Sequence, residues 1–285
     1  MPEDFLHTQD WYDVLADLAG AVSGDDFPRK LAQAYQGVTT YNSSLIVAYT
    51  GNHSPLYLFD NLPEEEKQRT LKPYFDGAYL LDPFYDLYRN GAEDGIYQLS
   101  EIAPDEFYQS EYYQTYYSAT HLRDEATILV AVNDKLHLLI SLGQRGSGSQ
   151  LSDAEFARLK RITPLMIALC RKHWSDVGLP GVGDGAQILG GPLDKAFRNF
   201  GRSYLSDREC EVIHLILKGH SSKSIARLLG ISPDTVKVHR KRFHSKLEIT
   251  SAAELFSLFL EAISLVPLDS EEDPLTYYYA QTTSH

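Results

Sequence analysis

The sequence predicts two domains of different fold class. The first is an α+β domain in which helices flank an antiparallel sheet, and the second is an all-α domain of four helices. Three observations predict this division: two strand pairs with short turns before residue 145, a glycine-rich stretch near residues 178–192, and dense helical periodicity after Leu205. The length of 285 residues also fits about two domains, at roughly 150 residues per domain.

The first elements alternate between helix and hairpin. Residues 8–20 form a predicted helix with Thr8 as its N-cap and Gly20 as its end, and residues 27–36 form another. The apolar segments 44–50 and 55–60 flank Gly51–Asn52 and predict a β-hairpin. Pro63 then opens a helix whose first turn holds three glutamates, where the helix dipole favours negative charge.

The next elements complete the predicted sheet. Residues 95–100 read as a short strand and residues 103–120 as a helix. The segments 124–134 and 135–143 predict a second hairpin around Asn133–Asp134, and residues 151–174 predict a long helix containing Pro164. Because strands and helices do not alternate regularly, we expect an antiparallel sheet flanked by helices, similar to GAF- and PAS-like sensor domains.

Composition sets the domain boundaries and the compartment. Six glycines with Pro180 and Pro192 lie between residues 178 and 192, which predicts a flexible linker. We therefore expect a sensing domain at 1–174, a linker at 175–200, a helical domain at 201–266 and a loose tail at 267–285. The N-terminus lacks the features of a secretory signal, and the sequence has no apolar run long enough to cross a membrane. The two cysteines suit a reducing compartment, so we expect a cytoplasmic protein.

Charge separates the helical domain from the rest. The whole chain carries a formal charge of −13. Residues 201–266 hold 10 basic and 7 acidic side chains, a net charge of +3, so the remaining residues carry −16. The basic region is therefore small and confined to one domain.

The helical domain begins with three capped helices. Ser206 and Glu209 form the spacing of a capping box. A second helix begins at Ser221 or Ser222 and stops at Gly230, and Ser232–Pro233 opens a third. Two helices joined by a short glycine-containing turn predict a helix-turn-helix (HTH) motif. The third helix combines apolar positions with five Lys or Arg side chains, which suits insertion into the DNA major groove.

Five stretches between residues 205 and 256 carry a resemblance to a known family: LSDRECEVI, KGHSSKSIA, LGIS, TVKVHRK and KLEITSAAEL. Together they closely resemble the DNA-binding domain of LuxR-type (NarL/FixJ-type) transcriptional regulators. Ser224 and Glu248 depart from the usual family residues. The resemblance implies an HTH motif from about Ser222 to Lys241 and a homodimer that binds double-stranded DNA, with RNA polymerase as a possible partner. It assigns base contacts to Lys237, Val238 and Lys241, phosphate contacts to Thr235, His239, Arg240 and Lys246, and dimerisation to Leu255, Leu258 and Phe259.

The first domain shows no motif for other control chemistry. It lacks the βα repeat of a phosphoacceptor receiver, and the sequence has no phosphate loop and no HExxH or CxxC metal pattern. No nucleophile–base motif stands out either. We therefore expect no enzyme activity, no catalytic or metal residues and no cofactor, and a small-molecule sensor is the leading interpretation.

Tyrosine density marks the candidate ligand site. Ten of the 19 tyrosines fall between Tyr74 and Tyr117, and tyrosine suits a pocket for a ligand with apolar and polar parts. Helical spacing would put Tyr108, Tyr112 and Tyr116 on one face and Tyr113 and Tyr117 on another. These residues could instead fill a core or form a dimer contact. In a further alternative, the tyrosine-rich surface binds a protein partner, and the chain is then a DNA-binding adaptor.

The stretch 74–88 resembles the Tyr…Tyr…Asp-Pro region of acyl-homoserine lactone receptors, in which the Asp binds the ligand amide. That position is Asp82 here, although Arg69 stands about where those receptors have a Trp. Asp82 could instead be an N-cap followed by Pro83. The candidate ligand residues are Tyr74, Tyr79, Asp82, Tyr85, Tyr112 and Tyr116.

Overall fold

A five-stranded antiparallel sheet forms the centre of the N-terminal part. The computed structural model describes residues 5–51, 54–146, 150–177, 179, 193–267 and 270–282. The strands are β1 (Ser43–Thr50), β2 (Leu56–Asp60), β3 (Gly95–Gln98), β4 (Leu122–Ala131) and β5 (Leu136–Arg145). Their order is β2-β1-β5-β4-β3, and every neighbouring pair is antiparallel. The structure therefore confirms the predicted fold class and both hairpins.

The hairpin turns follow from local side-chain chemistry. Between β4 and β5, the side-chain oxygen of Asn133 accepts the N–H groups of Lys135 at 2.9 Å and Leu136 at 3.0 Å. Between β1 and β2, Gly51 has φ +62°, a conformation that glycine adopts without steric cost. Asn52, the other residue of that predicted turn, lies outside the described residues.

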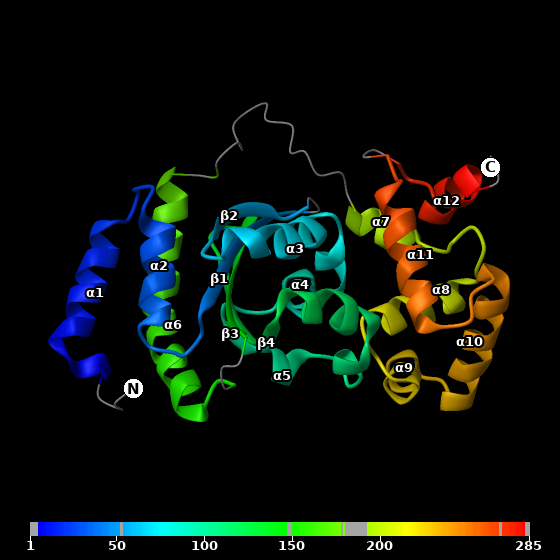
Figure 1. Cartoon of the computed structure of the whole chain (residues 1–285), viewed down its shortest axis with the longest axis horizontal. Helices are drawn as coiled ribbons and strands as arrows, with labels where there is room; N and C mark the ends of the chain where they lie inside the picture. Colours follow the sequence, from blue (N-terminus) through cyan, green and yellow to red (C-terminus); the bar gives the residue numbers. More distant parts are fainter. Residues whose placement is uncertain are drawn as a thin grey trace. The chain divides into compact units, whose positions relative to one another are not determined.

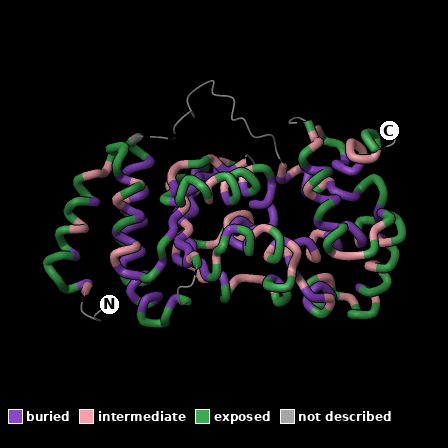
Figure 2. The backbone as a smooth tube through the Cα atoms, viewed as in Figure 1, coloured by how far each residue is buried: buried purple, intermediate pink, exposed green. Residues whose placement is uncertain are grey.

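Two helices, α2 (Phe27–Gln36) and α6 (Asp153–Val177), cover one face of the sheet, and α1 (Gln9–Gly20) packs on the outer side of α2 (Figure 1). Thr8 caps α1 by accepting the N–H of Trp11, as predicted. The helices and that face of the sheet share one hydrophobic core, and the buried strands stand out in Figure 2. Residues on the opposite face, such as Tyr49 and Leu139, are also buried, so both faces of the sheet are covered. Burial on both faces explains why the strand sequences are nearly continuous apolar runs.

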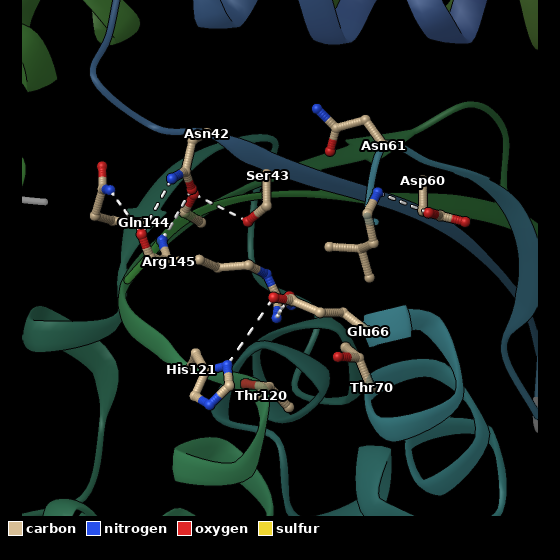
Figure 3. A network of polar contacts seen from close by, with 12 residues as sticks. Asn42, Ser43, Asp60, Asn61, Glu66, Thr70, Thr120, His121, Gln144 and Arg145 are labelled. Atoms are coloured by element: carbon tan, nitrogen blue, oxygen red, sulfur yellow. Dashed lines mark hydrogen bonds and ion pairs between the residues drawn. The ribbon is translucent and has the colours of Figure 1, made fainter. Parts of the chain in front are cut away.

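A polar network secures one end of the sheet (Figure 3). The Asn42 side chain accepts the Arg145 N–H at 2.9 Å and donates to the Arg145 carbonyl at 3.1 Å, which joins the start of β1 to the end of β5. The Arg145 guanidinium lies 3.2 Å from the Glu66 carboxylate, and only 12% of its side-chain surface is exposed. Breaking a pair this enclosed leaves a buried charge without compensation, so the network fixes the β1–β5 end firmly.

The chain divides into two compact units that do not follow its linear order. The first contains residues up to 67, 87–102 and 121–189, and the second contains 68–86, 103–120 and 190–285, in each case as far as they are described. Short helical segments from the middle of the sequence therefore belong to the same unit as the C-terminal helices. They are η2 (Ala78–Leu81), η3 (Phe107–Gln109), η4 (Tyr112–Tyr117), η5 (Ser118–Thr120) and most of α3 (Glu64–Phe75) and α4 (Pro83–Arg89). One further short helix, α5 (Leu99–Ile102), belongs to the first unit.

The predicted continuous helix at 103–120 is wrong. The segment is broken into two 3₁₀ turns and a π-helix. Tyr112 and Tyr117, at the two ends of the π-helix, are both buried, and they have the i, i+5 spacing that π-helix hydrogen bonds join. The buried residues of this segment therefore do not follow the four-residue spacing of the predicted α-helix.

Six helices complete the second unit: α7 (Leu193–Asn199), α8 (Asp207–Leu217), α9 (Ser222–Leu229), α10 (Pro233–Leu247), α11 (Ala252–Ser264) and α12 (Pro274–Thr282). The first of them, α7, occupies the end of the predicted linker, and α12 lies in the predicted tail, where Leu275 is fully buried. Most of the linker, residues 178 and 180–192, lies outside the described residues. The domain boundaries stay predictions.

Candidate nucleic-acid interface and tyrosine cluster

Reciprocal capping fixes the start of α8. The Glu209 carboxylate accepts the Ser206 N–H at 2.8 Å, and the Ser206 hydroxyl accepts the Glu209 N–H at 3.4 Å. This is the predicted capping box, and it satisfies two backbone donors that a helix end leaves free.

A tight turn joins α9 to α10. Gly230 ends α9 with φ +64°, and the Ser232 hydroxyl caps α10 by accepting the Thr235 N–H at 3.0 Å. Pro233 occupies the first turn of α10, where its missing N–H costs nothing. Only residues 230–232 separate the two helices, which is the connection that an HTH motif requires.

The two sides of α10 differ in polarity. Val236, Phe243 and Leu247 are buried against the rest of the helical domain. Lys237, Val238 and Lys241 are exposed, and 48% of the Val238 surface is accessible although it is apolar. Lys237 pairs with the Asp234 carboxylate at 3.0 Å. Among the described residues, neither Lys241 nor its neighbour Arg242 has a carboxylate within ion-pair distance, so these two side chains carry uncompensated positive charge.

The residues assigned to phosphate contacts are partly buried or already bonded to other side chains of the domain. The Thr235 hydroxyl lies 2.8 Å from the Ser232 hydroxyl, and Arg240 donates to the Ser222 hydroxyl at 3.2 Å. His239 is half-buried. Lys246 donates to the Glu209 carboxylate at 2.6 Å. Burial raises the pKa of Glu209, but hydrogen bonds from Lys246 and Ser206 lower it further, so the net direction is down.

The three residues assigned to dimerisation lie inside the helical domain. Leu255 and Phe259 are fully buried, and Leu258 is 6% exposed. The Phe259 ring packs edge-on against Phe197 and Phe200, with ring centres 5.3 and 5.4 Å apart. These side chains therefore build the core that holds α11 to α7, whatever else α11 does.

The structure brings the six candidate ligand residues into one cluster. The rings of Tyr79 and Tyr85 are 5.1 Å apart, and those of Tyr112 and Tyr116 are 5.4 Å apart. The Tyr74 ring links the two pairs, at 6.2 Å from Tyr79 and 6.5 Å from Tyr116. Tyr116 donates to the Thr70 carbonyl at 2.9 Å, so the cluster contains satisfied hydroxyls as well as stacked rings.

Asp82 lies at the polar end of this cluster. One carboxylate oxygen accepts the Phe84 N–H at 2.8 Å, which is an N-cap contact at the start of α4. The other accepts the Tyr74 hydroxyl at 3.1 Å, and the residue is buried. Arg69, at the position of the receptor Trp, is exposed.

Sequence reasoning missed a set of contacts around the turn between α8 and α9. Ser221 donates its backbone N–H to Asp105 at 3.0 Å, and Lys218 pairs with Asp86 at 2.6 Å. Both acidic residues come from segments more than 100 positions away in the sequence, and no spacing rule connects such partners.

None of the helices within the described ranges is both long enough and apolar enough to cross a membrane.

The comparisons with known proteins agree with this geometry. Residues 203–259 match the model of bacterial regulatory proteins of the luxR family. An HTH-type transcriptional regulator of Aeromonas salmonicida, named for the region 3′ of exeN, is 32% identical over 197 residues, which cover 68% of this chain and all of that protein. The transcriptional regulatory protein TdiR of Thauera aromatica is 45% identical over 60 residues, 21% of this chain and 26% of TdiR.

The N-terminal part also has a structural relative. The crystal structure of the VqsR LBD domain from Pseudomonas aeruginosa is 28% identical, with a TM-score of 0.52, and the match covers 59% of this chain and 99% of that one. The fold and the capped helices together define an HTH transcriptional regulator with an α+β N-terminal domain. The chain belongs to the luxR family of bacterial regulatory proteins, which are not enzymes.

Proposed function

We propose that this regulator binds double-stranded DNA as a homodimer through α10, and that a small organic ligand in its N-terminal domain controls the binding. The observation that carries the DNA part is the exposed basic side of α10, where Lys237, Val238 and Lys241 project from an otherwise acidic chain. Lysine can donate to guanine O6 and N7, and valine can contact the thymine methyl group. Such a protein acts in the cytoplasm, where bacterial DNA lies.

The DNA proposal is tested by removing the two lysines. We expect Lys237→Ala and Lys241→Ala each to cost about 1–3 kcal/mol of binding free energy at a selected site and to relax base preference there. Fluorescence anisotropy with duplexes chosen from a random pool measures both effects.

Lys135→Ala is the matched control, because it removes the same charge from an exposed turn of the sheet domain. Its affinity should stay within about twofold of the unmodified protein, since a single distant charge is largely screened by salt. If the Lys237→Ala, Lys241→Ala double variant keeps its affinity and its base preference, α10 does not bind the DNA bases.

The ligand part is supported by the tyrosine cluster and by the likeness to the VqsR LBD domain. Tyrosine rings and hydroxyls together suit an organic ligand with an apolar part and a few polar groups. The buried Asp82 carboxylate is the charged acceptor of this cluster, and it would receive a ligand donor beside the Tyr74 hydroxyl and Phe84 N–H that it already binds. A metabolite screen by thermal shift tests this part, because a ligand that binds only the native state raises its apparent stability.

A further inference from the structure

One carboxylate lies on the basic side of α10. Asp234 is the only acidic residue of this helix, whose residues 233–247 are all described, and 87% of its side-chain surface is exposed. It precedes Lys237, Val238 and Lys241 by three, four and seven positions, so the four side chains share one face of the helix. This is the exposed face to which the base contacts are assigned, because the apolar residues of α10 are buried on its other side.

The start of α10 fixes where this carboxylate lies. The Ser232 hydroxyl caps the helix by accepting the Thr235 N–H at 3.0 Å, and Pro233 is the first residue of the helix. Asp234 is therefore the second residue. In an HTH protein the N-terminal residues of the recognition helix contact base edges in the major groove. A groove-bound α10 would thus bring the Asp234 carboxylate to the base edges together with Lys237.

A carboxylate on this face weakens binding to DNA in general. Positive side chains supply the affinity for the phosphate backbone, and a negative charge repels phosphate whatever the base sequence. A carboxylate in a first turn also favours the helix dipole. Asp207 and Glu254 do this at the starts of α8 and α11, to which no base contact is assigned. The dipole does not require an acid on the helix that enters the groove, so we looked for a base that would bind it.

Asp234 forms a donor–acceptor pair with Lys237. The Lys237 Nζ atom lies 3.0 Å from the Asp234 carboxylate. Both side chains are largely exposed, so the ion pair is weak and its atoms are accessible to a base edge. Side chains three positions apart on a helix stay adjacent. The ammonium and the carboxylate can therefore approach the same base pair together.

A G·C base pair is complementary to these two groups. In the major groove guanine presents the acceptors O6 and N7, and its cytosine partner presents the N4 amino donor. An N–H···O hydrogen bond joins cytosine N4 to guanine O6, so these two atoms lie about 2.9–3.0 Å apart. The Lys237 and Asp234 groups are 3.0 Å apart. The lysine can thus donate to guanine while the carboxylate accepts from cytosine.

The other base pairs fit the two groups less well. In an A·T pair, adenine offers the lysine only one acceptor, N7, and the thymine O4 acceptor lies beside the carboxylate. Reversing a G·C pair places the amino donor against the ammonium and the acceptors against the carboxylate. Such mismatched groups lower the affinity for the wrong sequence. The carboxylate therefore excludes wrong base pairs in addition to binding the right one.

We infer that Asp234 is a specificity-determining residue: together with Lys237 it reads one G·C pair in each half-site, with the lysine on guanine and the carboxylate on the cytosine amino group. The inference rests on the proposed DNA-binding function of α10. Because the carboxylate repels phosphate, removing it should strengthen binding to unrelated DNA while it weakens the preference for the selected site. A residue that only stabilises the helix would not change these two quantities in opposite directions.

The experiment measures the affinity of the full-length protein for a duplex selected from a random pool, by fluorescence anisotropy at one salt concentration. Each base pair of a half-site is replaced in turn. Each cytosine is also replaced by N4-methylcytosine, which pairs with guanine but lacks the free N4 hydrogen in the major groove. Asp234→Ala is compared with the unmodified protein. Asp207→Ala is the matched control, because it removes the same charge from the exposed first turn of α8.

At one position of each half-site, the unmodified protein should prefer G·C by at least about fivefold, and N4-methylcytosine there should lower the affinity by about as much. Asp234→Ala should reduce both ratios to within about twofold of unity, and it should bind an unrelated duplex of equal length roughly twofold more tightly. Asp207→Ala should match the unmodified protein in all three measurements. Thermal unfolding checks that each variant is folded.

Two results would overturn the inference. One is an Asp234→Ala protein that keeps every base preference and its sensitivity to N4-methylcytosine. The other is an unmodified protein that tolerates N4-methylcytosine at every cytosine of the half-site. The second result requires no variant, so it decides the question even if Asp234→Ala does not fold.

The Lys237→Ala, Lys241→Ala double variant separates this inference from the proposed function. If the double variant keeps the affinity and base preference of the unmodified protein, the DNA-binding function through α10 fails. If it loses them while Asp234→Ala keeps its base preference, only the inference about Asp234 fails.

Discussion

Several single residues serve functions that their sequence neighbours do not reveal. Lys246 was expected to reach phosphate, but it lies on the Glu209 carboxylate of the capping box. That carboxylate is 3% exposed, so the ion pair is more enclosed than an ordinary surface pair and helps to hold the end of α10 to the start of α8. A contact with DNA would have to compete with this pair.

His214 shows how burial changes a residue on α8. Its ring packs against Phe197, with ring centres 4.7 Å apart, and its Nε2 atom is buried. Burial lowers the pKa of His214 to about 4, and the nearby positive charges of Lys218 and Arg202 act in the same direction. The imidazole is therefore neutral in the folded protein at physiological pH.

This predicts an acid-sensitive helical domain. The unfolded chain binds a proton at His214 near pH 6.5, whereas the folded chain resists it down to about pH 4. Stability should therefore fall as the pH drops through this window, by up to about 3 kcal/mol from this residue. Urea unfolding of the unmodified protein and of His214→Leu between pH 7 and pH 4.5 measures the difference. Parallel pH profiles for the two proteins would contradict the prediction.

At the scale of elements, α4 and η4 each carry residues that both stabilise the local structure and belong to the candidate ligand cluster. Asp82 and Pro83 start α4 as an N-cap and its first residue. The same carboxylate also holds Tyr74 in the aromatic cluster. The π-helix η4 turns Tyr112 and Tyr117 inward together, which a regular α-helix would not do with residues five apart.

Two substitutions at Asp82 separate a ligand contact from a helix cap. If the carboxylate binds a ligand donor, Asp82→Asn should lower ligand affinity by about 1.5–3 kcal/mol with the fold nearly intact. Asn caps a helix about as well as Asp, so a cap alone predicts little change in that variant. Asp82→Ala should cost about 0.5–2 kcal/mol of stability in either case. Calorimetric titration with a ligand found by the thermal-shift screen measures the ligand affinity, and thermal unfolding measures the stability. If both are unchanged in the Asp82→Asn protein, Asp82 is only a helix cap.

At the scale of the whole molecule, the proposed homodimer sets the form of the DNA site. A two-fold symmetric HTH protein reads an inverted repeat with half-sites about one helical turn apart. Duplexes selected from a random pool should therefore contain inverted repeats and bind two protomers, as measured by footprinting and by the mass of the complex. A selected site with one half-site and one protomer at saturation would exclude this arrangement.

Charge substitutions at Leu255 or Phe259 are poor tests of that dimer. Both residues are fully buried within the chain, so a charge there would unfold the domain whether or not α11 forms the interface. The exposed residues of α11, such as Ser257 and Glu261, are better positions for probing an interface without disturbing the core.

The sequence by itself determined the features that depend on near neighbours. Strand pairs with short turns, the caps at Thr8, Ser206 and Ser232, and the glycine at Gly230 all act within a few residues, so local chemistry predicts them. The HTH motif and its basic helix belong to the same group, because their periodicity and charge are local. The predicted fold class and the luxR family were confirmed for this reason.

Only the tertiary structure decided which distant side chains meet. The pairs Lys246–Glu209, Asp105–Ser221 and Lys218–Asp86 join residues 37, 116 and 132 positions apart, and no periodicity links such partners. The π-helix at 112–117 likewise buries both Tyr112 and Tyr117, which a regular α-helix would not do with residues five apart. Periodicity predicts which residues are buried, but which residues they contact depends on how the whole chain folds.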